Sequence, residues 1–208
     1  MTDTPAARRP RRDALENRAG ILAAATATIA HDPHASIDTI ARSAGLTRRA
    51  LYGHFEDRDA LIREVVAAGA QRFNAIALSI HDDDPRIALA RLASQLWTEA
   101  SHVQVAASIA LDDAHVLETA DALAPLRRTV VAIVRRGQDA DVLRTDVAAP
   151  TLARLVEEAA RAVITRMDAS SPEARSLAVR AVLSIAGLSW REAVALLARH
   201  PELLEEHR

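Results

Sequence analysis

The chain has 208 residues, of which half are apolar and only five are aromatic, and it contains no lysine and no cysteine. This length suffices for a small domain joined to a larger one, and the abundance of Ala, Leu, Arg and Val favours an all-α protein. The formal net charge of −2 excludes a protein that coats nucleic acid over its whole surface, and the lack of cysteine excludes disulfides and thiolate metal sites.

The N-terminal segment, residues 1–12, predicts a disordered basic arm that can contact phosphates, because it contains two prolines and four arginines: Arg8, Arg9, Arg11 and Arg12. Asp13 and Glu16 have the spacing of a capping box, so we expect the first helix to begin at Asp13. Its apolar residues recur on one face up to a break at residues 31–34.

Two short helices are predicted next, on either side of a glycine. Ser36 can cap a helix that ends at Gly45, and Thr47 can cap a second one over residues 48–55. The pair has its own small apolar core: Ile37, Ile40, Leu46, Leu51 and Phe55. This arrangement is typical of a helix-turn-helix at about residues 36–55, with the outer face of its second helix exposed.

A long helix capped by Asp57 is predicted over residues 58–80, and the aspartate-rich run 82–85 marks the domain boundary. Beyond it, helices are expected over residues 85–100, 102–119, 122–136, 149–167 and 172–199. The last of these is apolar on more than one side, so we expect it to dimerise together with residues 149–167. Changing Leu183 or Leu196 to Arg would then give monomers.

The segment from Ser36 to Phe55, together with residues 56–61, resembles the DNA-binding head of the TetR family of transcriptional regulators at many consecutive positions. The resemblance implies a DNA-binding domain over residues 13–73 and an effector-binding and dimerisation domain over 84–208. It also implies a homodimer that binds a palindromic double-stranded DNA operator, most often as a repressor that a small, largely apolar effector releases.

The N-terminal end of the second short helix carries Arg48 and Arg49, and such an end enters the major groove in helix-turn-helix proteins. Arginine can donate two hydrogen bonds to guanine, so we expect base reading by Arg49 first and Arg48 second. The alternative is that both only neutralise phosphates. Arg49 and Ala50 stand where the family commonly has small residues, so the operator sequence cannot be transferred from relatives.

Further DNA contacts are implied by the resemblance. Thr47, Tyr52 and His54 stand where the family holds phosphates, and Arg58 stands where it usually has lysine. Ser36 is counted with these DNA-binding residues. For Tyr52, burial against the first helix is the rival interpretation.

Several bulky or polar side chains interrupt the Ala- and Val-rich C-terminal helices and could line an effector cavity: Trp97, His102, Gln104, Arg161, Thr165 and Met167. Ordinary packing or surface placement explains each of them about as well. Trp97 and Met167 are the two candidates that we name for ligand binding.

Catalytic and metal sites are not expected. The densest polar group, His102 with Asp112, Asp113 and His115, lacks the ligand spacing of a metal site, and no nucleophile elbow or glycine-rich phosphate loop is present. Neither a signal peptide nor an apolar run of about 18 residues is found, so we expect a cytoplasmic regulator with no cofactor and no membrane contact. The competing interpretation is a helical ligand-binding or scaffold protein whose helix-turn-helix is only structural.

Overall fold

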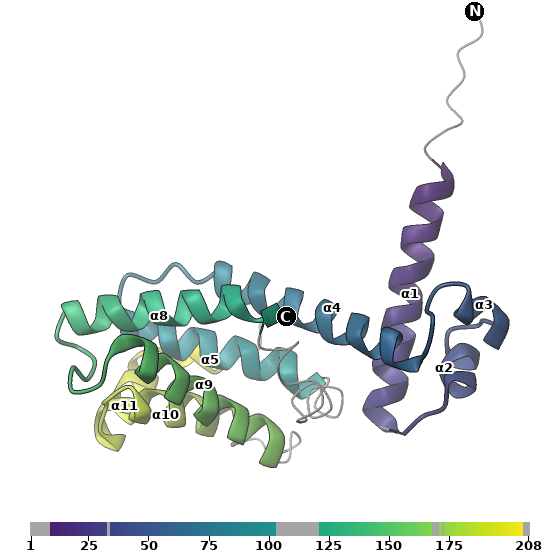
Figure 1. The fold of residues 1–208 in the computed structure, drawn as a ribbon. Helices are drawn as coiled ribbons and strands as arrows, with labels where there is room; N and C mark the ends of the chain where they lie inside the picture. The colour runs from purple at the N-terminus through teal and green to yellow at the C-terminus, as the bar shows by residue number, and fades with distance from the viewer. Residues whose placement is uncertain (1–8, 33, 103–120, 168–170, 172, 206–208) are drawn as a thin grey trace, which may run out of the picture. The chain divides into compact units, whose positions relative to one another are not determined.

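The computed structural model in Figure 1 describes residues 9–32, 34–102, 121–167, 171 and 173–205, with the backbone alone for 9–17 and 102. Every regular element in these ranges is a helix, as predicted. Packing divides the chain into an N-terminal unit, residues 1–68, and a C-terminal unit, residues 69–208. The division falls within the helix α4 (Arg58–Leu78), so that this helix belongs in part to each unit.

The N-terminal unit begins with α1 (Arg9–His31), which packs against α2. The prediction that a capping box starts this helix at Asp13 is wrong, since the helix begins four residues earlier, and residues 9–12 are helical rather than disordered. Pro10 lies in the first turn, where its fixed φ and missing N–H are tolerated. The remainder of the predicted basic arm, residues 1–8, lies outside the described residues.

The two short helices are α2 (Ile37–Ser43) and α3 (Arg48–Tyr52), which lie side by side in Figure 1. Ser36 caps α2 by accepting a hydrogen bond from the Thr39 amide at 3.2 Å, and Thr47 caps α3 in the same way from Ala50 at 3.2 Å. Gly45, between the helices, has a φ of +70°, which favours glycine. The predicted helix-turn-helix is thus present, with α3 shorter than expected.

The C-terminal unit contains α5 (Pro85–His102), α8 (Ala124–Asp139), α9 (Ala149–Arg166), α10 (Ala174–Ile185), α11 (Trp190–Arg199) and the short η1 (Pro201–Leu203). α10 packs against both α5 and α9, and α8 packs against α5 and α9. Their apolar faces form one core with fully buried Leu89, Val134, Leu152, Val179 and Leu183. The helix predicted over residues 102–119 lies almost entirely outside the described residues.

The end of α8 differs from the prediction. Gly137, the residue that follows the predicted helix 122–136, lies inside the helix, which continues to Asp139. The side chain of Leu143 packs so closely on Gly137 that a Cβ at this position would overlap it. This packing, and not a turn, is the reason for glycine at position 137. The chain turns instead at Asp141, which adopts a φ of 53°.

The single helix predicted over residues 172–199 is also wrong, because the structure divides it into α10 and α11. Gly187 has a φ of +115°, and Ser189 then starts α11 with a capping box to Glu192. Both helices pack into the core of their own unit, where Leu183 and Leu196 are buried. Arginine at either position would disrupt this core, so neither change can test dimerisation.

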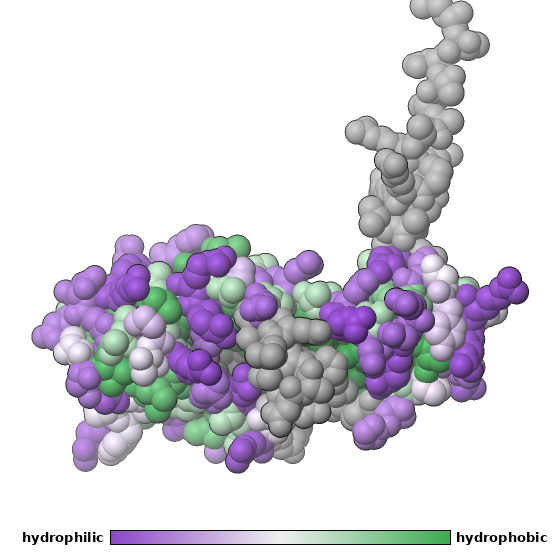
Figure 2. Space-filling view, viewed as in Figure 1, coloured by the Kyte–Doolittle hydropathy of each residue, from purple (hydrophilic) through white to green (hydrophobic). Residues whose placement is uncertain are grey.

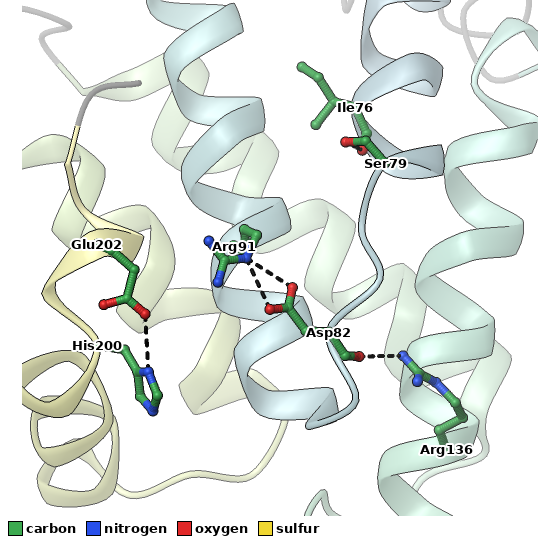
Figure 3. A network of polar contacts seen from close by, with 7 residues as sticks. All are labelled: Ile76, Ser79, Asp82, Arg91, Arg136, His200 and Glu202. Carbon is green, nitrogen blue, oxygen red and sulfur yellow. Dashed lines mark hydrogen bonds and ion pairs between the residues drawn. The ribbon is translucent and has the colours of Figure 1, made fainter. Parts of the chain in front are cut away.

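The loop between α4 and α5 is tied to its neighbours by Asp82 (Figure 3). The Asp82 carboxylate accepts two hydrogen bonds from Arg91 Nε, at 2.9 and 3.1 Å, and its carbonyl accepts one from Arg136 at 3.3 Å.

In the last turns of α4, Asn74 accepts a hydrogen bond from the Leu126 amide at 3.0 Å and donates to the Ala122 carbonyl at 2.9 Å. Asn74 therefore caps α8, whose own N-cap residue makes no side-chain hydrogen bond.

Candidate DNA-binding interface

The helix α3 has a buried side and an exposed side. Leu51 and, just beyond the helix, Phe55 are buried in the N-terminal unit. Arg48, Arg49 and Tyr52 are exposed. Residues four apart lie on one face of a helix, so the sequence places the two apolar side chains inward and leaves the cationic residues outward.

Arg48 is already engaged within the protein. Its guanidinium forms an ion pair with Asp38 Oδ2 at 3.2 Å and lies 5.5 Å from the centre of the Tyr52 ring. Interaction with the Tyr52 side chain and then with the Asp38 carboxylate raises the pKa of Arg48. Any contact of Arg48 with a base would therefore compete with Asp38.

Arg49 differs from its neighbour in this respect. Its side chain is exposed and makes no hydrogen bond or ion pair with any residue in the described ranges. A guanidinium in this state can approach a guanine without first breaking an internal pair. Base reading by Arg49 first and Arg48 second stays a prediction, and the two side chains differ in that only Arg48 has an internal ion pair.

Three of the predicted phosphate-binding residues, Thr47, Tyr52 and His54, lie in or next to α3. Tyr52 is 42% exposed, so the interpretation that it is buried against the first helix is wrong. Thr47 uses its oxygen to accept the Ala50 amide, which leaves its hydroxyl hydrogen available as a donor. His54 is half-buried, with its ring beside that of Phe55.

Ser36 and Arg58 have structural partners as well. The Ser36 hydroxyl caps α2 and lies 3.0 Å from that of Thr39. Arg58 is half-buried at the start of α4, and its Nε donates to the Ala35 carbonyl at 3.3 Å. DNA binding by these two residues remains a prediction, and for Arg58 it would have to coexist with a role in the fold.

Sequence reasoning missed Arg18. Its guanidinium pairs with Glu64 on α4, donates to the His54 carbonyl at 3.0 Å and lies 4.5 Å from the centre of the Phe55 ring. The available signal was its spacing, because Arg18 is on the same helical stripe as buried Ile21 and Ala25. A charge on an otherwise buried stripe indicates a specific partner.

The two ligand-binding candidates are close in the C-terminal unit. Trp97 is buried with Val163, Ala174 and Ala178, and Met167 packs against this cluster. Thr165 donates to the Arg161 carbonyl at 3.0 Å, as helical threonines commonly do. Gln104, the His102 side chain and the polar group at residues 112–115 lie outside the described residues.

The fold and the exposed arginines of α3 define the class as a helix-turn-helix DNA-binding regulator. Residues 21–65 match the family model described as bacterial regulatory proteins, tetR family. The match lies in the N-terminal unit and confirms the predicted resemblance to this family of regulatory proteins. Among curated proteins, no sequence matches that of this chain.

Several solved structures share the fold, among them one described as a TetR family transcriptional regulator. PfmR from Thermus thermophilus superposes with a TM-score of 0.68 at 22% identity, over 81% of this chain and 98% of that one. FadR from Bacillus subtilis in complex with stearoyl-CoA gives 0.69 at 13% identity, over 81% and 97% of the two chains. RolR in complex with resorcinol gives 0.61 at 15% identity, over 91% and 96%.

No helix in the described parts of the chain is both long and apolar enough to cross a membrane.

Proposed function

We propose that the protein is a ligand-responsive transcriptional repressor that binds a palindromic DNA operator as a homodimer. The observation that carries this proposal is the exposed Arg49 at the N-terminal end of α3, which has no polar partner among the described residues. Thr47 at the start of α3, Tyr52 at its end and His54 just beyond it carry groups that can donate to phosphates. Repression follows from a bound dimer obstructing RNA polymerase.

Operator binding can be tested without knowing the target gene. Purified protein is mixed with sheared DNA from its own genome, and the retained fragments are sequenced. We expect a few loci to be enriched, each with an inverted repeat whose half-sites are one helical turn apart, about 34–36 Å. Retained DNA with the same sequence composition as the input would contradict specific binding.

The proposed dimer uses the outer faces of α9 and α10. Leu155 on α9 is 44% exposed, and Leu177 on α10 is partly exposed. Figure 2 shows apolar residues interspersed with polar ones on the visible face of the C-terminal unit. Two copies of such a helix pair can form a four-helix interface, which covers these leucines.

Leu155→Arg should convert dimers to monomers in sedimentation experiments, because the interface would bury an unpaired charge. Val194→Arg is the matched control, since Val194 is 45% exposed on α11, the part of residues 172–199 that the turn at Gly187 separates from α10 and that lies outside the interface now proposed. It should leave the dimer intact. A monomeric wild-type protein at micromolar concentration would contradict the proposal.

The proposed effector site includes Trp97 and Met167. Two molecules of different chemistry that occur in the structural neighbours, stearoyl-CoA and resorcinol, are suitable probes. In a Trp190→Phe variant, Trp97 is the only tryptophan, so a bound probe should change its emission. A probe that releases DNA must itself bind more weakly to the DNA complex by the same factor, which calorimetry can measure.

A further inference from the structure

Arg18 brings together three segments of the N-terminal unit through one side chain. It lies on α1, its Nε donates to Glu64 Oε2 on α4 at 3.0 Å, and its second terminal nitrogen also pairs with Glu64. The remaining nitrogen donates to the His54 carbonyl at 3.0 Å, just beyond α3. All three groups of the planar guanidinium are used, which lysine could not reproduce.

The face of the same guanidinium is also in contact. It lies 4.5 Å from the centre of the ring of Phe55, the buried residue that follows His54. Arg18 and Glu64 are each about one-third exposed, with side-chain exposures of 34% and 39%. Their pair is therefore partly shielded from water, and its bidentate geometry sets an orientation as well as adding attraction.

The helix α3 needs such support because it has only five residues. A helix this short is not stable alone, so its position depends on its contacts with the rest of the unit. On the N-terminal side the Gly45 turn joins it to α2, and within it Leu51 is buried. On the C-terminal side the backbone leaves through His54 and Phe55, and both are in contact with Arg18.

We propose that Arg18 is a positioning residue for DNA recognition, which holds the C-terminal end of α3 against α1 and α4 so that Arg49 is presented in a fixed orientation. Arg18 acts through His54, Phe55 and Glu64 and does not itself contact DNA. This proposal rests on the proposed function, since it requires that α3 read DNA. It assigns to Glu64 the role of orienting Arg18.

The experiment compares wild-type protein with Arg18→Met and Glu64→Gln. Affinity is measured for a duplex obtained by binding-site selection with the wild-type protein and for an unrelated duplex, over a range of salt concentrations. All measurements are made well below each variant's melting temperature. We expect both variants to lower the ratio of the two affinities about five- to tenfold, without changing the salt dependence.

Glu64→Gln distinguishes the two roles that a partly exposed Arg18 could have, direct phosphate binding and positioning of α3. If Arg18 binds phosphate directly, loss of the Glu64 charge should strengthen binding to both duplexes, and Arg18→Met should reduce the salt slope by about one per head. Either result would overturn the positioning role. A loss of specificity in both variants at constant salt slope would support it.

Ile29→Val is the control for lost stability, because Ile29 is buried in α1 and makes none of these contacts. It should lower the melting temperature while leaving the affinity ratio unchanged. If Arg18→Met and Glu64→Gln behave in the same way as Ile29→Val, Arg18 is only structural and the proposal fails. If the wild-type protein selects no duplex, the proposed function itself fails, which is a separate outcome.

Discussion

Two glycine turns in this protein have nearly the same local sequence and geometry. Ala44-Gly45-Leu46-Thr47 joins α2 to α3, and Ala186-Gly187-Leu188-Ser189 joins α10 to α11. Both glycines have positive φ, +70° and +115°. In both turns the leucine amide bonds back to a carbonyl five residues earlier, at 2.8 and 3.0 Å, and the hydroxyl residue caps the next helix.

The outer faces of the second helices differ. α3 starts with Arg48 and Arg49, whereas α11 starts with Trp190 and Arg191, and the Arg191 guanidinium stacks on the Trp190 ring at 4.5 Å. α11 also has an acidic residue in its first turn, Glu192, whereas α3 has none there. A carboxylate at that place would repel DNA phosphates.

A glycine turn between two helices changes the direction of the chain and does not by itself indicate DNA binding. The class of the protein depends on the side chains that the second helix exposes. The interpretation that a helix-turn-helix is only structural therefore describes α10–α11 well. It does not describe α2–α3, whose outer face is cationic.

Replacing each glycine with alanine should give the largest difference between the two turns in the free energy of unfolding. Both changes strain a positive φ, at a cost of about 1–2 kcal/mol. A Cβ on Gly187 would also lie 2.8 Å from Arg144 Cβ and 2.9 Å from its backbone nitrogen, whereas nothing lies within 4 Å of one on Gly45. We expect Gly187→Ala to cost roughly 2–4 kcal/mol in urea unfolding, with the overpacking added to the strain. Equal losses at the two sites would show that the close approach of Arg144 is unimportant.

Removal of the two helix caps should have a smaller effect on the free energy of unfolding. Thr47→Ala and Ser189→Ala should each lower the free energy of unfolding by about 1 kcal/mol, because each leaves a backbone amide of the first turn without its acceptor. Thr47→Ser and Ser189→Thr keep the oxygen and are the matched controls. If the alanine variants are no less stable than these controls, the caps have no energetic role.

The smallest expected difference between the two turns is in how the free energy of unfolding depends on pH. Hydrogen bonds from the Ser189 hydroxyl and amide lower the pKa of Glu192. A depressed folded-state pKa means that the contribution to stability is present above the unfolded value of about 4.3 and is lost as pH falls through the folded value. α3 has Ala50 at the matching position, so its cap has no such dependence.

Glu192→Gln should remove this part of the acid destabilisation, since the amide oxygen still accepts but does not titrate. Unfolding measured from pH 7 down to pH 3 should show a shallower decline for the variant than for the wild-type protein. Parallel declines would show that Glu192 is not linked to folding.

The sequence predicted one turn and missed the other for a physical reason. Residues around Gly45 form two short apolar faces with caps at Ser36 and Thr47, which indicate separate helices. Around Gly187 the apolar residues continue on both sides, which is also typical of one long buried helix. The serine and glutamate three residues apart, Ser189 and Glu192, were the available signal for a new helix start.

The chemistry of the candidate site was less predictable than its location. Arg48 and Arg49 are adjacent and identical in type, and only the folded chain shows that Asp38 pairs with the first and not with the second. The partners of Arg18 are 36 and 46 residues away, so no local pattern identifies them. Conversely, the helix predicted to end at residue 136 continues past Gly137, because the close packing of Leu143, and not a turn, requires that glycine.

Binding-site selection with three proteins tests most directly the claim that the outer face of α3 reads DNA. The wild-type protein and Arg191→Ala should recover the same palindromic motif. Arg49→Ala should lose about 1–3 kcal/mol on that site and lose information at one base position in each half-site, as expected when a bidentate contact to guanine is removed. An Arg49→Ala protein that recovers the wild-type motif with unchanged information at every position would contradict the assignment of base reading to Arg49.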